Sequence, residues 1–172
     1  MQKTIGLVVG IALVLLIGVF YVLSNNQKQV EKEDVKQLSV ETHNFNKVLA
    51  YENDYMGNNS NITNLFNKLP LSNYKYTVEL EPDTFTAAIN YNTSSDEKAV
   101  IYNTTAAFVL IKNLEVIDMR FSDQSYVMTR ENVEQWFGDD FERLIDPSIF
   151  KDKVQNALME STTTNWIDQY TK

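Results

Sequence analysis

The 172-residue chain contains no cysteine and a single histidine, His43. Without cysteine, the chain has no disulfides, thiolate zinc sites, cysteine nucleophiles or lipid-modified N-terminal cysteine. One histidine leaves little material for a Ser-His-Asp triad or a histidine-rich metal site. Glycine occurs five times and builds no phosphate-binding loop, and no G-x-S-x-G motif is present. We therefore expect no enzyme, and no catalytic, cofactor-binding or metal-binding residues.

Basic residues are also few. The chain has 15 lysines and arginines and 23 aspartates and glutamates, which gives a formal net charge of −8. Such a chain repels dense arrays of phosphates, so we expect no nucleic-acid partner. Lys3 is the only charged residue in positions 1–23, so the rest of the chain is more acidic still. We do not expect that part to lie flat on an anionic membrane surface.

Residues 5–23 form one long hydrophobic run, nineteen positions without a charge, an amide or a proline. As a helix with a rise of about 1.5 Å per residue, the run spans roughly the 30 Å hydrocarbon core of a bilayer. Phe20 and Tyr21 near its end suit the membrane interface. The pattern predicts a short tail at 1–4, a transmembrane signal anchor at 5–23, and a single-pass protein of the cell membrane.

Two alternatives accompany this prediction. The first is a cleaved signal peptide, although the run is longer than the usual stretch of about 7 to 15 residues and lacks a small-x-small cleavage site. The second concerns orientation, because Lys3 precedes the run while Lys28, Lys32 and Lys36 follow it. We favour an extracytoplasmic domain, because one N-terminal span after a lysine resembles a secretory signal that was never cut.

Residues 24–41 form a polar linker, which is either a helix through Val30, Asp34 and Leu38 or a disordered stalk. Residues 42–160 carry the patterns of a folded extracytoplasmic domain. We expect residues 161–172 to form a loosely held C-terminal tail. Trp166 and Ile167 are apolar residues in this tail that could pack against the domain.

Apolar spacings of three and four residues predict helices in the domain, and strict alternation predicts strands. In chain order we expect a short helix from Phe45 to Glu52, a helix ending at Leu69, strands at 74–81 and 85–91, a central helix at 96–113, strands at 116–121 and 126–128, and helices at 130–137 and 147–158. Each strand pair is read as a hairpin. Because segregated hairpins do not give a doubly wound parallel sheet, we predict an α+β fold. Its antiparallel sheet of about four strands packs against the central helix, with flanking helices.

Capping residues mark several of these helix ends. Ser94 and Glu97 have the spacing of a capping box for the central helix. Thr129 is expected to cap the helix at 130–137, and Gly138 to end it. Further caps are expected at Asn59 or Ser60 and at Asp146, which precedes Pro147.

Acidic residues are the remaining candidates for chemistry. Glu79 and Glu81 alternate along one strand face, where exposure to water already explains them, and Asp139 and Asp140 follow a helix end. These four carboxylates define the alternative function, a divalent-metal-dependent envelope hydrolase. His43 lies where the linker meets the domain, and we expect an exposed side chain there.

Two segments carry a resemblance to a known family. They are Tyr55-Met56-Gly57-Asn58-Asn59-Ser60, before a helix that ends at Leu69-Pro70, and Tyr126-Val127-Met128-Thr129-Arg130-Glu131, which leads to Trp136-Phe137-Gly138. Residues 44–140 thus resemble an uncharacterised family of membrane-anchored or exported proteins of Gram-positive bacteria, the domain of unknown function 4825 family. The family's turn reads Tyr-x-Gly-Asp-Asn-Ser, so Asn58 departs from it by the loss of a carboxylate. The resemblance implies a location and a domain but no activity.

Anchor and composition together predict a non-enzymatic membrane protein. We expect its extracytoplasmic domain to bind a protein, a peptide or another component of the cell envelope.

Overall fold

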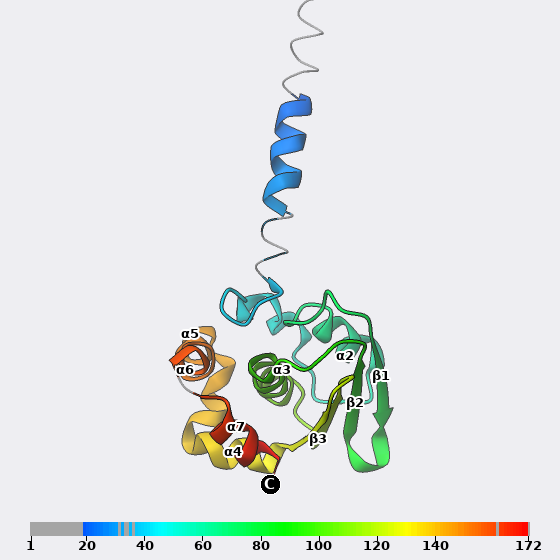
Figure 1. Cartoon of the computed structure of the whole chain (residues 1–172), viewed down its shortest axis with the longest axis vertical. Coiled ribbons are helices and arrows are strands. Elements are labelled where there is room, and N and C mark those ends of the chain that lie inside the picture. The colour runs from blue at the N-terminus through cyan, green and yellow to red at the C-terminus, as the bar shows by residue number, and fades with distance from the viewer. Residues whose placement is uncertain (1–18, 31, 33–34, 36, 161, 172) are drawn as a thin grey trace, which may run out of the picture. The chain divides into compact units, whose positions relative to one another are not determined.

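The structure is a computed structural model that describes residues 19–30, 32, 35, 37–160 and 162–171. The chain divides into two compact units, Met1–Lys36 and Gln37–Lys172 (Figure 1).

In the first unit, residues 19–30 are helical. The side chains of residues 19–23 are all apolar and 57% to 75% exposed. The remainder of the expected transmembrane segment, 5–18, lies outside the described residues. Among those that are described, no helix is both long and apolar enough to cross a membrane. Residues 24–30, the first part of the polar linker, are helical, as in the first of the two structures considered for the linker.

The second unit is built on a four-stranded sheet in the order β1-β2-β3-β4. Its strands are β1 (Tyr76–Glu81), β2 (Thr86–Tyr91), β3 (Val116–Arg120) and β4 (Ser125–Thr129). Both expected hairpins are present, because β1 pairs with β2 and β3 with β4 in antiparallel fashion. The central pair, β2 and β3, is parallel. The α+β class is confirmed, but the prediction of an all-antiparallel sheet is wrong, and the sheet is mixed.

The physical reason is the helix α3 (Glu97–Leu110) between the two hairpins. A helical crossover carries the chain back to the end of the sheet from which it started, so the next strand runs in the same direction. Nearly all of α3 is buried, as expected for the central helix. It lies between the sheet and the C-terminal helices (Figure 1). The sheet face on the side away from α3 is not covered by these helices. A helix covered from several sides needs no polar face, which explains its apolar sequence.

Most expected caps are present. Thr129 Oγ1 accepts a hydrogen bond from the Asn132 amide at 3.2 Å, at the start of α4 (Arg130–Phe137). Gly138 ends α4 with a φ of +54°, and Asp146 caps α5 (Pro147–Phe150).

Two cap predictions are corrected by the structure. Ser94 does not cap α3, because Asp96 lies directly before the helix and its carboxylate accepts from the amides of Lys98 and Ala99. The helix α2 (Asn59–Phe66) is capped by Asn58, one residue earlier than expected.

The expected helix from Phe45 to Glu52 is replaced by two 3-10 turns, η1 (Phe45–Lys47) and η2 (Leu49–Tyr51). Asn53 then pairs with Ile111 in an isolated parallel bridge. The amides of Val48 and Tyr51 donate to the carbonyl oxygens three residues before them, Phe45 and Val48, which is the 3-10 pattern.

The C-terminal part is helical throughout most of its length. α5 continues through the π-helical segment η5 (Lys151–Asn156) into α6 (Ala157–Glu160). Gln155 of η5 is buried, and its Nε2 donates to the carbonyl oxygens of Val40 at 2.5 Å and His43 at 2.8 Å. This buried amide therefore fastens the first residues of the unit to its C-terminal helices.

The last helix is α7 (Thr164–Tyr170), in the segment expected to be a loosely held tail. Trp166 and Tyr170 are buried there, and Ile167 packs against the core. Trp166 and Ile167 therefore pack against the domain, as their apolar character indicated. The segment 162–171 lies within the second compact unit.

Candidate functional site

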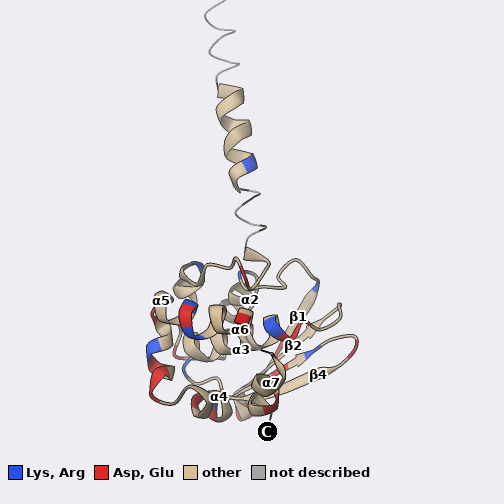
Figure 2. Cartoon of the chain, turned by 60° about the vertical axis from the view of Figure 1, so that its left-hand side comes forward, with Lys and Arg blue, Asp and Glu red and all other residues tan. Residues whose placement is uncertain are grey.

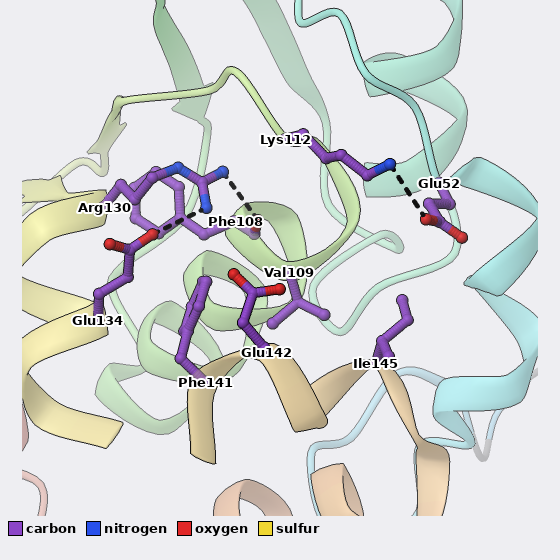
Figure 3. Close-up of a pocket in the computed structure, with 9 residues that line it drawn as sticks. All are labelled: Glu52, Phe108, Val109, Lys112, Arg130, Glu134, Phe141, Glu142 and Ile145. Carbon is purple, nitrogen blue, oxygen red and sulfur yellow. Dashed lines mark hydrogen bonds and ion pairs between the residues drawn. The ribbon is translucent and has the colours of Figure 1, made fainter. Parts of the chain in front are cut away.

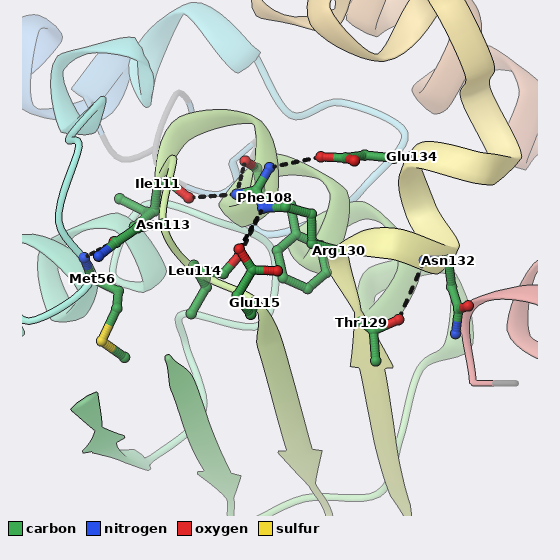
Figure 4. Close-up of polar contacts among 10 residues, drawn as sticks. All are labelled: Met56, Phe108, Ile111, Asn113, Leu114, Glu115, Thr129, Arg130, Asn132 and Glu134. Carbon is green, nitrogen blue, oxygen red and sulfur yellow. Dashed lines mark hydrogen bonds and ion pairs between the residues drawn. The ribbon is translucent and has the colours of Figure 1, made fainter. Parts of the chain in front are cut away.

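The two segments that carry the family resemblance converge on the C-terminal end of α3 (Figure 4). From the first segment, the Met56 amide donates to Asn113 Oδ1 at 2.6 Å. Just before it, the Asn53 amide donates to the Leu110 carbonyl at 2.8 Å, and the Lys112 amide donates back to Asn53 at 3.0 Å. The turn at 53–56 therefore holds the loop that follows α3.

From the second segment comes Arg130, the first residue of α4, whose side chain is only 12% exposed. Its Nη2 donates to the carbonyl oxygens of Phe108 at 2.9 Å and Ile111 at 2.7 Å, and its Nε donates to Leu114 at 2.9 Å. Its Nη1 donates to Glu134 at 3.4 Å. Phe108 lies in the last turn of α3, where carbonyls lack intrahelical partners and carry negative partial charge, and Ile111 and Leu114 follow the helix.

Beside this junction lies a pocket of about 290 Å³ (Figure 3). Its walls come from the end of α3, from α4, from the turn at 52 and from the 3-10 helix η4 (Gly138–Ile145). The apolar lining consists of Phe108, Val109, Phe141 and Ile145. The charged lining consists of Glu52, Lys112, Arg130, Glu134 and Glu142.

The two cations of the pocket are engaged by the protein itself. Arg130 is held by carbonyls, and its Cζ lies 5.4 Å from the Phe108 ring centroid and 5.8 Å from that of Phe141. Lys112 Nζ lies 2.8 Å from Asp54 and 3.9 Å from Glu52. The hydrogen bond and charge of Asp54 are the main causes that raise the pKa of Lys112.

The Glu142 carboxylate points from η4 into the pocket (Figure 3). Within the described residues we find no hydrogen bond or ion pair to this carboxylate, and it acts on Lys112 through charge alone. Acidic positions occur on strands, helices and loops of the unit (Figure 2), but here carboxylates outnumber cations around an apolar hollow. The pocket can therefore hold a small group that is partly apolar and positively charged.

The acidic residues of the alternative function lie on two different elements. Glu79 and Glu81 are on the exposed face of β1, as the alternation indicates. Asp139 and Asp140 belong to η4, where Asp140 pairs with Arg143 at 2.7 Å and Lys153 at 3.4 Å. Within the part of the chain that is described, no group of three or more His, Cys, Asp or Glu side chains is placed to hold a metal ion.

His43 is buried at 4% exposure, so the expectation of an exposed side chain is wrong. Its Nε2 lies 2.9 Å from the Lys68 carbonyl oxygen and its Nδ1 lies 2.7 Å from the Tyr102 hydroxyl. Because a carbonyl only accepts, Nε2 carries the proton and Nδ1 accepts from Tyr102. Burial lowers the pKa of His43 to about 4, against a smaller opposing effect of the Lys68 carbonyl.

The fold and the pocket define an α+β domain with a mixed four-stranded sheet, helices on one sheet face, and a small charged pocket at one helix end. Residues 48–131 match the family model of a domain of unknown function, DUF4825, so the chain contains a domain of this family. No curated protein and no solved structure matches. The matched stretch includes the α3 wall of the pocket and Arg130, and the chain adds the η4 wall after it.

Proposed function

We propose that this protein is a single-span membrane protein whose extracytoplasmic domain is a non-enzymatic binding module. Its ligand is a protein, a peptide or another component of the cell envelope. The observation that carries the proposal is the pocket at the end of α3, where an apolar floor and a charged rim are held by rigid elements.

The anchor is supported by the hydrophobic run at 5–23. Its last five residues are helical and exposed on all sides within their own unit. Exposed apolar surface costs about 25 cal/mol per Å² in water and loses that cost in hydrocarbon. A bilayer is therefore the environment that suits this helix.

Replacing Val14, in the middle of the run, with arginine should lower the fraction of the protein that is held in membranes. A central arginine opposes insertion by about 2.5 to 3.5 kcal/mol. The measurement is the fraction of full-length chain that stays in the membrane pellet after an alkaline wash. Val30→Arg, outside the run, is the matched control and should remain in the pellet. If the unaltered chain washes into the supernatant, the anchor is refuted.

Binding is supported by the form of the pocket. At about 290 Å³ it is at the lower end of small-molecule sites, which suits one side chain or head group of a larger ligand. Arg130, which lines the pocket, and the buried His43 both donate to backbone carbonyls. The arrangement favours recognition over chemistry.

A photo-reactive benzoylphenylalanine at Lys112, on the pocket rim, should give a discrete cross-linked product in native membranes. The same residue at Lys151, exposed on η5 away from the pocket lining, is the control and should give none. Illumination of intact membranes followed by electrophoresis and mass spectrometry reads the result. Equal products from both positions, or none from Lys112, would refute a binding role of the pocket.

The alternative, a metal-dependent hydrolase, has a separate test. A metal that binds only the native chain raises the melting temperature at saturation. A rise with magnesium or calcium that is lost in a Glu79→Gln, Glu81→Gln double variant would favour that alternative over the binding module.

A further inference from the structure

We propose that the pocket at the end of α3 selects a primary ammonium group on an aliphatic stem, the chemistry of a lysine side chain of a partner peptide. This inference rests on the proposed binding function and names the group that is bound.

The charge of the pocket is the first step. Three carboxylates, from Glu52, Glu134 and Glu142, face the hollow together with two cations. The donors of Arg130 are directed to three carbonyls and to Glu134, and Lys112 is paired with Asp54. The uncommitted charge that projects into the space is the Glu142 carboxylate. A ligand cation gains from this arrangement, whereas a ligand anion finds no free cation there.

The apolar lining is the second step. Val109, Phe141 and Ile145 line the same hollow as Glu142 (Figure 3). An ammonium group on a four-carbon stem places methylenes on apolar surface and its charge at the rim. A free cation such as a metal ion would leave that apolar surface unused.

One ammonium group of the chain already lies at this pocket. The ammonium of Lys112 lies at the rim of this pocket, 2.8 Å from Asp54 and 3.9 Å from Glu52. The rim thus already holds one lysine ammonium between carboxylates. Removal of Lys112 leaves Glu52 available to an incoming ammonium.

The test uses the full-length chain in micelles of a neutral detergent, with isoleucine δ1-methyl groups labelled with ¹³C. The probe is Nα-acetyl-lysine methylamide, and the control probe is its Nε-acetylated form, which keeps the stem and loses the charge. We expect the Ile145 methyl signal to shift saturably with the lysine probe and at least about fivefold more weakly with the neutral probe. The Ile101 methyl, buried in α3 away from the pocket lining, should not move.

Variants give the second readout. Glu142→Gln should weaken binding of the lysine probe about two- to fivefold, whereas Glu160→Gln, an exposed carboxylate on α6, should leave it unchanged. Lys112→Met should tighten it. Equal shifts with both probes, or equal affinity of the Glu142→Gln and unaltered chains, would overturn the proposal. If the Lys112 cross-link forms in membranes while the lysine probe causes no shift, the binding function stands and the ammonium specificity falls.

Discussion

Replacing Arg130 with methionine is expected to lower the free energy of unfolding of the unit Gln37–Lys172 by about 3 to 5 kcal/mol. The guanidinium donates to the carbonyl oxygens of Phe108, Ile111 and Leu114, and its side chain is nearly buried. Methionine fills similar space but leaves these carbonyls without that donor at the end of α3. Urea unfolding of the full chain in neutral micelles measures the loss through tryptophan fluorescence, because both tryptophans belong to this unit.

Two further variants make the result specific. Arg143→Met removes an arginine whose side chain is 63% exposed and paired with Asp140, and it should change the unfolding free energy by less than about 1 kcal/mol. Arg130→Lys keeps the charge but not the planar fork of donors, so its loss should be intermediate. If Arg130→Met costs no more than Arg143→Met, the guanidinium does not hold the end of α3.

Features with a local physical cause were predictable from the sequence. The strand β1 follows from strict alternation, and the start of α4 follows from a threonine that can accept from an amide three residues on. Proline after Asp146 marked the start of α5 for the same reason. Each of these features depends on residues that lie within a few positions of one another, so a single sequence is enough to predict it.

The parallel pairing of β2 with β3 was not predicted, although its elements were. Alternation identifies a strand but says nothing about its direction in the sheet. Direction depends on the connection, and a 14-residue helix between two hairpins favours a parallel crossover over another antiparallel step. The length of the helix expected between the hairpins, residues 96–113, was the available indication.

The contacts of Arg130 at the pocket, and of the buried His43 outside it, were missed because their partners are distant in the sequence. Arg130 binds carbonyls 16 to 22 positions away, and His43 binds Tyr102 across 59 positions. One indication for Arg130 was present, because a positive charge at the first turn of a helix opposes the helix dipole and needs another reason to be there. For His43 no local pattern distinguishes a buried side chain from an exposed one. Glu142 follows the helix end together with Asp139 and Asp140, where a solvated acidic corner explains the three residues better than a weak cation site.

Acidification is expected to destabilise the same unit through His43. Burial lowers the pKa of its imidazole from 6.5 to about 4 in the folded chain, whereas in the unfolded chain the group titrates near its ordinary value of about 6.5. Between these values the unfolded state binds more protons, so the free energy of unfolding falls as the pH falls. The contribution of His43 is complete above about pH 6.5, and the loss is on the order of 3 kcal/mol at pH 4.

A His43→Gln variant separates this effect from the titration of carboxylates. Glutamine retains one donor and one acceptor for Lys68 and Tyr102 but does not titrate. The stability advantage of the unaltered chain over this variant should therefore shrink by on the order of 3 kcal/mol between pH 7 and pH 4. Because His43 is the only histidine in the chain, its single imidazole resonance reports the folded pKa directly. A midpoint near pH 6.5 would mean that water reaches the ring, and an advantage independent of pH would contradict the buried neutral imidazole.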